Sequence, residues 1–441
     1  MYSKDDAAQF PPMGWNSYDY YNTMVNEAQV RANAEYMAAN LKKYGWEYIV
    51  IDIQWSDPDA GSLNPRVQYI PFSRFCVDGY SRQIPAPNRF PSSAGGKGFA
   101  PLAEYIHSLG LKFGLHMMRG IPRFCAHEHA KILGTDVTAD KIANPYSISR
   151  WNPDMYGVDC SKKGAQEYYD SIFALYASWG VDYVKVDDIC NTNMYPNDPY
   201  SAEKEIEAIA HAIEKSGRKM VLSLSPGPAV IEKAWHLEKY ANMWRITDDF
   251  WDTWPLLKGM FERCEVWQKH VGGGNWPDCD MLPIGKLGYG FGNEWYTRLT
   301  ENEQKTMMTL WCMFRSPLMI GTDLTQLDEK TLPLITNLEV LYLEKNSHGA
   351  FQLYRDEEKC VWVSFGNGCP ARGACVNLAF FNFKDTAAEV SVNLSEIGVL
   401  LPGTLYSQRD LWEKKDYAPV QGDSELSKTV PAHGTVLIQL R

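Results

Sequence analysis

Two pairs of adjacent carboxylates are the residues of this chain best suited to do chemistry. Asp187 and Asp188 lie near the end of "VDYVKVDDIC", which begins with the Val and Tyr residues typical of a buried strand. Asp248 and Asp249 follow a shorter apolar run in "YANMWRITDDFWDTW". A buried ionised carboxylate is strongly unfavourable unless it is paired. Each strand therefore ends either at the surface or at a site that needs the charge.

Two carboxylates across a cleft would suit glycoside hydrolysis. One attacks the anomeric carbon or activates a water, and the other protonates the leaving oxygen. Lys185 would keep Asp187 ionised, as a nucleophile requires, and a dry aromatic setting would raise the pKa of Asp249, as a general acid requires. Alternatively, such residues cap a helix or balance an arginine. We interpret Asp188 and Asp248 as the structural members, although the residues alone do not choose within each pair.

A repeated unit of helix, glycine and short apolar strand would position these side chains. In the unit before Ser225, apolar residues recur at helical spacing from Ile206 to Ile213, and Gly217 predicts the helix end. Such alternation predicts an α/β fold with a parallel sheet. No GxGxxG or Walker A sequence opens a helix. Polar residues end at least four strands, which favours a (β/α)8 TIM barrel over an open doubly wound sheet; they are Asp52 and Trp55, His116 and Arg119, Lys185 and Asp187, and Ser223 and Ser225.

The pattern changes near residue 345. Runs such as "CVNLAFFNF" and "GTVLIQLR" are short, alternate in polarity and are separated by Gly, Asn, Asp and Pro. We expect an antiparallel β-sandwich packed on the barrel. The predicted domains are a catalytic barrel over 1–343 and a C-terminal β-sandwich over 344–441.

Composition excludes several classes of protein. The 441 residues carry a net charge of −11, which argues against a nucleic-acid partner. The start lacks a secretory pattern and no apolar run is long enough to cross a membrane. Ten Cys without CxxC pairs are typical of reduced thiols, so we expect a cytoplasmic protein. The oligomeric state stays open, with a homo-oligomer among the alternatives.

Several ordered motifs resemble glycoside hydrolase family 27, the α-galactosidase and α-N-acetylgalactosaminidase family. The resemblance runs from "PPMGWNSY" to "FRSPLMIGTDL" and more loosely beyond, and is that of a divergent, bacterial-type member. It implies a retaining exo-α-glycosidase for terminal α-galactosyl-type residues, without a cofactor, acting on a glycoside or oligosaccharide. From "VKVDD" it implies Asp187 as nucleophile, and from "WRITDD" it implies Asp249 as acid/base.

The same resemblance implies a set of substrate contacts. "MGWNSY" places Trp15 in the sugar pocket, and "NWPDCDML" places Asp280 and Met281 at its rim. Trp55 and Trp276 are expected to add stacking faces. The ring hydroxyls are expected to be held by Asp52, Lys185, Arg245 and Asp280.

Departures from the family pattern bear on specificity. The family's second strand carries two consecutive Asp that hold the 4- and 6-hydroxyls, whereas "VIDIQW" has Asp52 followed by Ile53. We expect His116 and Arg119 as replacement contacts, although His116 could equally be a core histidine. Ser225 in "LSLSPG" stands where α-galactosidases often place a bulky acidic residue, so it either leaves room for an N-acetyl group or begins a turn. Trp151 and Asp154 are candidates for an outer subsite.

Several alternatives stay open at this point. Within the class they are α-N-acetylgalactosaminidase, β-L-arabinopyranosidase and α-glucan hydrolase specificity. Outside it they are a non-catalytic sugar-binding relative and a phosphate-binding barrel, for which "VGGGNW" is the only candidate loop. The sequence "HEH" at 127–129 does not predict a metal site, because neighbouring helical side chains diverge.

Overall fold

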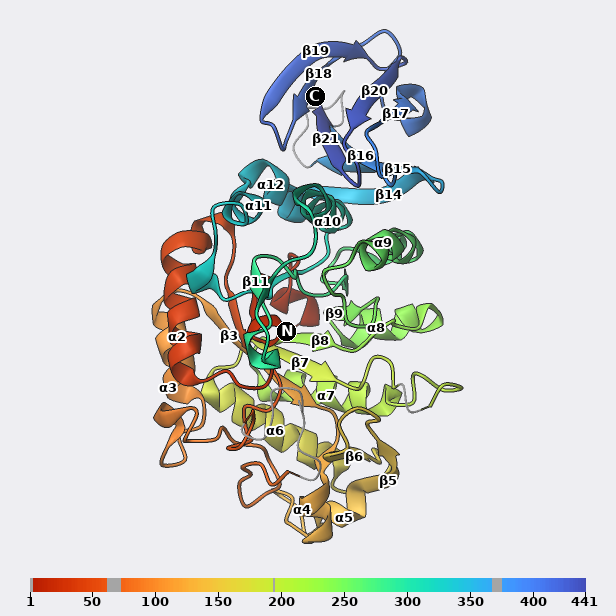
Figure 1. Cartoon of the computed structure of the whole chain (residues 1–441). Coiled ribbons are helices and arrows are strands. Elements are labelled where there is room, and N and C mark those ends of the chain that lie inside the picture. The colour runs from red at the N-terminus through yellow and green to blue at the C-terminus, as the bar shows by residue number, and fades with distance from the viewer. Residues whose placement is uncertain (1–2, 62–72, 193–194, 367–374) are drawn as a thin grey trace.

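The chain folds into a barrel that carries a second, all-β domain at one end (Figure 1). The computed structural model describes residues 3–61, 73–192, 195–366 and 375–441. The C-terminal strands lie beyond helices α10 and α12, which separate them from the body of the barrel in Figure 1.

The barrel sheet has eight parallel strands among the described residues, in the order β10-β9-β8-β7-β3-β2-β1-β13. Its first and last strands approach through a parallel bridge between Leu282 and Ile320. This arrangement confirms the predicted barrel. The strands are β1 (Met13–Asn16), β2 (Tyr48–Ile51), β3 (Lys112–Met118), β7 (Tyr183–Asp187), β8 (Val221–Leu224), β9 (Met243–Arg245), β10 (Trp276–Asp278) and β13 (Leu318–Ile320).

Helices connect successive barrel strands on the outside of the sheet. A four-residue helix, α1 (Tyr18–Tyr21), follows β1 directly. The larger helices are α2 (Glu27–Tyr36), α3 (Ala100–Ser108), α6 (Ala165–Trp179), α7 (Glu203–Ser216), α8 (Ala234–Tyr240), α9 (Trp254–Trp267) and α10 (Glu301–Phe314), and α11 (Leu332–Thr336) and α12 (Leu338–Asn346) follow the last strand.

Local sequence explains where these helices begin and end. In α7 the apolar stripe with Ile206, Ile209 and Ile213 is buried, and Gly217 ends the helix at φ 72°, as the sequence predicted. Only a residue that tolerates the left-handed region fits there easily. Helix α10 begins with a capping box, in which Thr300 and Glu303 each accept a backbone N–H of the other.

A small antiparallel sheet interrupts the barrel between β3 and α6. It comprises β4 (Ile121–Pro122), β5 (Ala143–Ile148) and β6 (Met155–Val158), in the order β4-β6-β5. Two short helices, α4 (Arg123–His127) and α5 (Ala139–Ile142), complete this insertion. Because it follows the carboxyl end of β3, it lies where a barrel builds its site.

The C-terminal domain is an antiparallel sandwich, as predicted. A six-stranded sheet of order β14-β15-β16-β21-β18-β19 faces the pair β17-β20 across an apolar core that includes Val363, Phe380 and Val390. The predicted boundary at 343–344 falls inside α12, and the residue bounds of the two domains stay a prediction. The strands are β14 (Ser347–Arg355), β15 (Lys359–Gly366), β16 (Val376–Asn382), β17 (Ala388–Asn393), β18 (Leu405–Asp410), β19 (Lys415–Gln421), β20 (Glu425–Val430) and β21 (Thr435–Leu440).

Two further features bear on the sequence predictions. The cysteines within the described part of the chain are all free thiols. Among the described helices, none combines the length and apolar character needed to cross a membrane. The cytoplasmic location and the homo-oligomer remain predictions.

Candidate active site

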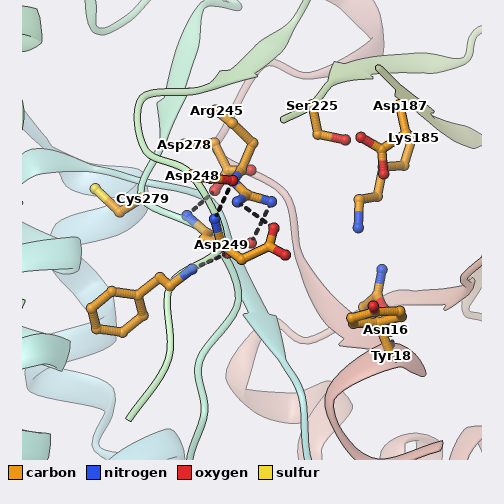
Figure 2. Close-up of polar contacts among 12 residues, drawn as sticks. Asn16, Tyr18, Lys185, Asp187, Ser225, Arg245, Asp248, Asp249, Asp278 and Cys279 are labelled. Atoms are coloured by element: carbon orange, nitrogen blue, oxygen red, sulfur yellow. Dashed lines mark hydrogen bonds and ion pairs between the residues drawn. The ribbon is translucent and has the colours of Figure 1, made fainter. Parts of the chain in front are cut away.

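A pocket of about 260 Å³ lies at the carboxyl ends of the barrel strands. Its polar wall includes both predicted catalytic residues, Asp187 at the end of β7 and Asp249 after β9. Figure 2 shows Asp249 and Arg245 on one side of an open space and Asp187 and Lys185 on the other. The remaining lining residues are Tyr18, Asp19, Asp52, Ile53, Trp151, Pro226, Asp248, Phe250, Trp251, Asp280 and Met281.

Asp187 is held by neighbours that favour its ionised form. The imidazole Nε2 of His116 lies 3.1 Å from Oδ2, and the Asp188 backbone N–H donates to Oδ1 at 3.0 Å. Burial opposes ionisation, but His116 and the Lys185 ammonium outweigh it and hold the pKa of Asp187 well below its usual value. Asp187 is therefore a carboxylate at neutral pH. His116 does not line this pocket, so it contacts Asp187 from behind rather than replacing a lost sugar contact.

Asp188 points away from the pocket. The residue sits at φ 56°, just after β7, and only 1% of its surface is exposed. Its carboxylate pairs with Arg119 at 2.9 Å, and Arg119 also pairs with Glu205 at 3.0 Å. Arg119 is thus ion-paired with two buried carboxylates. It does not line the pocket, contrary to the expectation that it contacts the sugar. The backbone turn after Asp187 separates the two neighbouring carboxylates.

Lys185 and Asp52 form a buried ion pair in the pocket wall. The ammonium Nζ lies 2.9 Å from Asp52 Oδ2, which also accepts from the Asn16 amide at 2.7 Å. Burial opposes both charges. The mutual attraction nevertheless lowers the pKa of Asp52 and, with Asp187, raises the pKa of Lys185 above its usual value. The pair therefore presents fixed charge to a polar ligand.

Arg245 joins two carboxylates on the opposite wall. Its guanidinium lies 3.1 Å from Asp249 Oδ1 (Figure 2). It also lies 2.9 Å from Asp280 Oδ1, and Asp280 accepts the Phe250 N–H at 2.8 Å. The Asp249 side chain is 60% exposed, so the dry setting predicted for it is wrong. A solvent-facing carboxyl at the pocket mouth can exchange protons with water directly.

Ile53 forms an apolar part of the wall beside Asp52. It lines the pocket and is 4% exposed. Behind it lies an apolar cluster with Phe75, Met118 and Met155. The strand end therefore offers one carboxylate and one hydrocarbon surface where the family pattern has two carboxylates.

Ser225 does not line the pocket as the sequence led us to expect. It is 1% exposed, and its hydroxyl lies 3.4 Å from the Val186 carbonyl oxygen, to which it donates. The next residue, Pro226, lines the pocket instead. Figure 2 shows Ser225 near Asp187, where it supports the strand end rather than facing the cavity.

The three tryptophans expected to stack on a sugar are core residues. The Trp15 indole N–H donates to the Thr322 carbonyl at 2.7 Å, and Trp55 donates to the His116 carbonyl at 2.7 Å. Trp276 packs inside the barrel among the first residues of other barrel strands, such as Tyr48 of β2 and Tyr183 of β7. Each is at most 2% exposed, so none offers a face to the pocket.

Other aromatic residues take that place. Tyr18 and Trp251 line the pocket, and Phe291 links them, with ring centroids 5.7 Å from Tyr18 and 5.6 Å from Trp251. Their positions just after β1 and β9 were the available signal, because barrel sites are built from strand ends. Trp151 lines the pocket as expected for an outer subsite, whereas Asp154 borders a separate small cavity behind Ile53.

One carboxylate and histidine cluster in the described chain has the spacing of a metal site. It comprises Glu203, Glu207 and His236, outside the barrel sheet. Its atoms already have protein partners, since Lys233 lies 2.7 Å from Glu203 and Lys204 lies 2.8 Å from Glu207. The cluster is therefore explained by ion pairing.

Comparison with known proteins agrees with this geometry. A model described as alpha galactosidase A matches residues 152–346, and one described as alpha galactosidase C-terminal beta sandwich domain matches residues 370–440. A family 27 β-L-arabinopyranosidase from Geobacillus stearothermophilus is 50% identical, with a TM-score of 0.93 over 99% of this chain and 97% of that one. The chain belongs to glycoside hydrolase family 27.

Curated family 27 relatives at lower identity are α-galactosidases. That of Coffea arabica is 27% identical over 98% of this chain and 93% of its own length. That of Cyamopsis tetragonoloba is 26% identical over 98% and 86%. A variant of the Geobacillus enzyme has been solved in complex with arabinose. These findings confirm the predicted family and identify the chain as a glycoside hydrolase acting on terminal glycosides.

Proposed function

We propose that this chain is a retaining exo-glycosidase that prefers β-L-arabinopyranosides. This sugar has the ring configuration of α-D-galactopyranose but lacks the C6 hydroxymethyl group. Asp187 is the proposed nucleophile and Asp249 the proposed acid/base. The observation that carries the proposal is Ile53 in the pocket wall beside Asp52.

The catalytic assignment rests on two different environments. Asp187 is ionised and its side chain is 15% exposed to the pocket, so it can attack C1 and form a covalent glycosyl-enzyme of inverted anomeric configuration. Asp249 lies at the exposed side, where a leaving group departs and water enters. It first protonates the departing oxygen and then removes a proton from the attacking water. The two inversions give net retention.

Fixed charges would bind the glycon hydroxyls. The Lys185–Asp52 pair and the Arg245–Asp280 pair line opposite parts of the pocket. Charged groups held by their own partners do not reorganise when the substrate binds. They can therefore contribute hydrogen bonds that strengthen as charge develops on the ring.

The specificity argument concerns the C6 position. In the family pattern two consecutive carboxylates after the β2 strand hold the 4- and 6-hydroxyls, and Ile53 stands in place of the second one. Ile53 cannot accept a hydrogen bond, and Phe75, Met118 and Met155 behind it supply no polar atom nearby except the thioether sulfurs. A C6 hydroxyl placed there would lose its hydrogen bonds to water without compensation. A pyranoside that lacks C6 avoids that loss.

A comparison of two p-nitrophenyl glycosides tests this proposal. We expect wild-type kcat/KM for the β-L-arabinopyranoside to exceed that for the α-D-galactopyranoside by about 10- to 200-fold, the range for one small group in a pocket. Ile53→Asp should reverse or strongly reduce the preference, and Ile53→Val, which stays apolar, should keep it. A wild-type preference for the galactoside would contradict the assignment.

The α-N-acetylgalactosaminidase alternative has weaker support in this geometry. It depended on Ser225 as a small residue facing the ligand, and Pro226 faces the pocket instead. The α-galactosidase alternative is tested by the kcat/KM values for the two p-nitrophenyl glycosides.

A further inference from the structure

One carboxyl group in the pocket has no part in the mechanism above. Asp19 lies in α1, directly after β1, and lines the same pocket as Asp187 and Asp249. Only 2% of its surface is exposed. It was not among the residues that the sequence motifs indicated.

The Asp19 side chain is confined by backbone yet lacks a partner. Oδ2 is buried and has no hydrogen-bond or ion-pair partner among the residues that the structure describes. The Gly288 N–H fixes the Asp19 carbonyl at 3.0 Å. A Cβ at Gly321 would lie 2.2 Å from Oδ2, so only glycine leaves room for the carboxyl there. Buried carboxyl groups are normally satisfied, and Asp19 lines the pocket, so a bound ligand can supply a partner to the carboxyl on its pocket side.

The surrounding charges favour the protonated carboxyl. Asp280, Asp249 and Asp52 approach from the ends of β10, β9 and β2, and Lys185 approaches from β7. Burial and then the charge of Asp280 raise the pKa of Asp19 well above its usual value, against the opposing effect of Lys185. A neutral carboxyl group can both donate and accept a hydrogen bond, as a sugar hydroxyl can.

We propose that Asp19, which lines the pocket, binds the glycon by hydrogen bonding one of its ring hydroxyls through the pocket-facing side of its carboxyl group. The inference rests on the proposed function, because it takes the ligand of this pocket to be a pyranoside. Strand β1 lies next to β2 in the sheet, so Asp19 and Asp52 line the same pocket from the ends of neighbouring strands.

A comparison of deoxy sugars tests this contact. We expect Asp19→Ala to lower kcat/KM about tenfold on the better p-nitrophenyl glycoside, the value for one good hydrogen bond. With one of the 2-, 3- and 4-deoxy analogues, wild type and variant should become equal, because the hydroxyl that Asp19 binds is missing. Asp19→Asn, which imitates the neutral acid, should stay within about threefold of wild type.

Gly321→Ala provides an independent variant. The added Cβ would displace the Asp19 carboxyl, so we expect Gly321→Ala to lower kcat/KM as well. This decrease should disappear with the same deoxy analogue that removes the effect of Asp19→Ala. Asp410 is a buried residue of the C-terminal domain, far from the pocket lining. Asp410→Asn should leave kcat/KM unchanged and controls for the loss of a buried carboxyl group in general.

Two results would overturn the inference. If Asp19→Ala lowers kcat/KM relative to wild type by the same factor on all three deoxy analogues, the residue only supports the fold. An Asp19→Asn variant as weak as Asp19→Ala would show that charge rather than hydrogen bonding matters. Calorimetric binding of L-arabinose and D-galactose to the same variants reports the contact without turnover. The contact can therefore be tested even if the enzyme does not prefer β-L-arabinopyranosides.

Discussion

At the residue scale, adjacent carboxylates have been separated by one backbone turn. Asp187 faces the pocket and is held ionised by His116 and Lys185, whereas Asp188 faces inward to Arg119. Burial and the neighbouring Asp187 charge raise the pKa of Asp188 to about 7 despite that arginine. The same residue type thus has two environments at consecutive positions.

Removal of the proposed nucleophile should leave a rescuable enzyme. We expect Asp187→Ala to lower kcat by about 10⁴-fold or more, because no covalent intermediate can form. Sodium azide should restore turnover by occupying the vacated space and should give a glycosyl azide of inverted anomeric configuration, identified by NMR. Near-normal activity in Asp187→Ala together with an inactive Asp188→Ala would show that the other carboxylate is the nucleophile.

At the element scale, the segments after β1, β9 and β10 build an aromatic wall near the proposed acid/base, Asp249. The wall consists of Tyr18, Trp251, Phe291 and Trp295, and the Trp251 ring centroid lies 6.1 Å from that of Trp295. The Trp295 indole donates to Asp252 at 3.0 Å, and Asp252 is fully buried. Trp251 and the proposed acid/base Asp249 line the same pocket, so we expect the wall to lie on the side from which a leaving group departs.

Loss of the wall should weaken aglycon binding only. We expect Trp251→Ala to raise KM about three- to tenfold for a glycoside with an aromatic or sugar aglycon, the value of one stacking contact. The KM of the corresponding glycosyl fluoride, which has no aglycon ring, should change little. Trp235→Ala removes a 58% exposed tryptophan on α8 and is the matched control. An equal KM change for both substrates would argue against an aglycon subsite.

At the scale of the whole molecule, the sandwich supports the helix that follows the site. Helix α9 begins shortly after Asp249, and its Phe261 packs between Phe381 and Phe383 with ring centroids 4.8 Å away in each case. Trp254 at the start of α9 stacks on His433 at 4.0 Å. The C-terminal domain therefore packs against an element that positions the acid/base loop.

This packing predicts a large loss of stability at the domain contact. We expect Phe261→Ala to lower the free energy of unfolding by about 3–5 kcal/mol, as for other buried aromatic truncations. Leu256→Ala, on the same helix but 40% exposed, should change it by less than about 0.5 kcal/mol. Urea unfolding followed by circular dichroism measures both. Similar values for the two variants would show that α9 does not depend on the sandwich.

The sequence by itself determined the features that depend on local periodicity. Alternating helices and strands predicted the barrel, Gly217 predicted a helix end, and acidic strand ends indicated where chemistry would lie. Ordered motifs indicated the family and placed Asp52, Lys185 and Arg245, which do line the pocket. These signals are local because backbone hydrogen bonding and side-chain spacing act over a few residues.

Only the tertiary structure decided which side chains face the pocket. Trp15 lies in the core because successive residues of a strand point to opposite faces, and the sequence does not say which face is which. Trp55 and Arg119 follow the ends of β2 and β3, where the course of the backbone directs them to the core and to buried carboxylates. The exposure of Asp249 and the burial of Asp19 were also not evident from the sequence. Their environments are made by residues from distant strands, such as Asp280 and Gly321, whose approach depends on closure of the whole barrel.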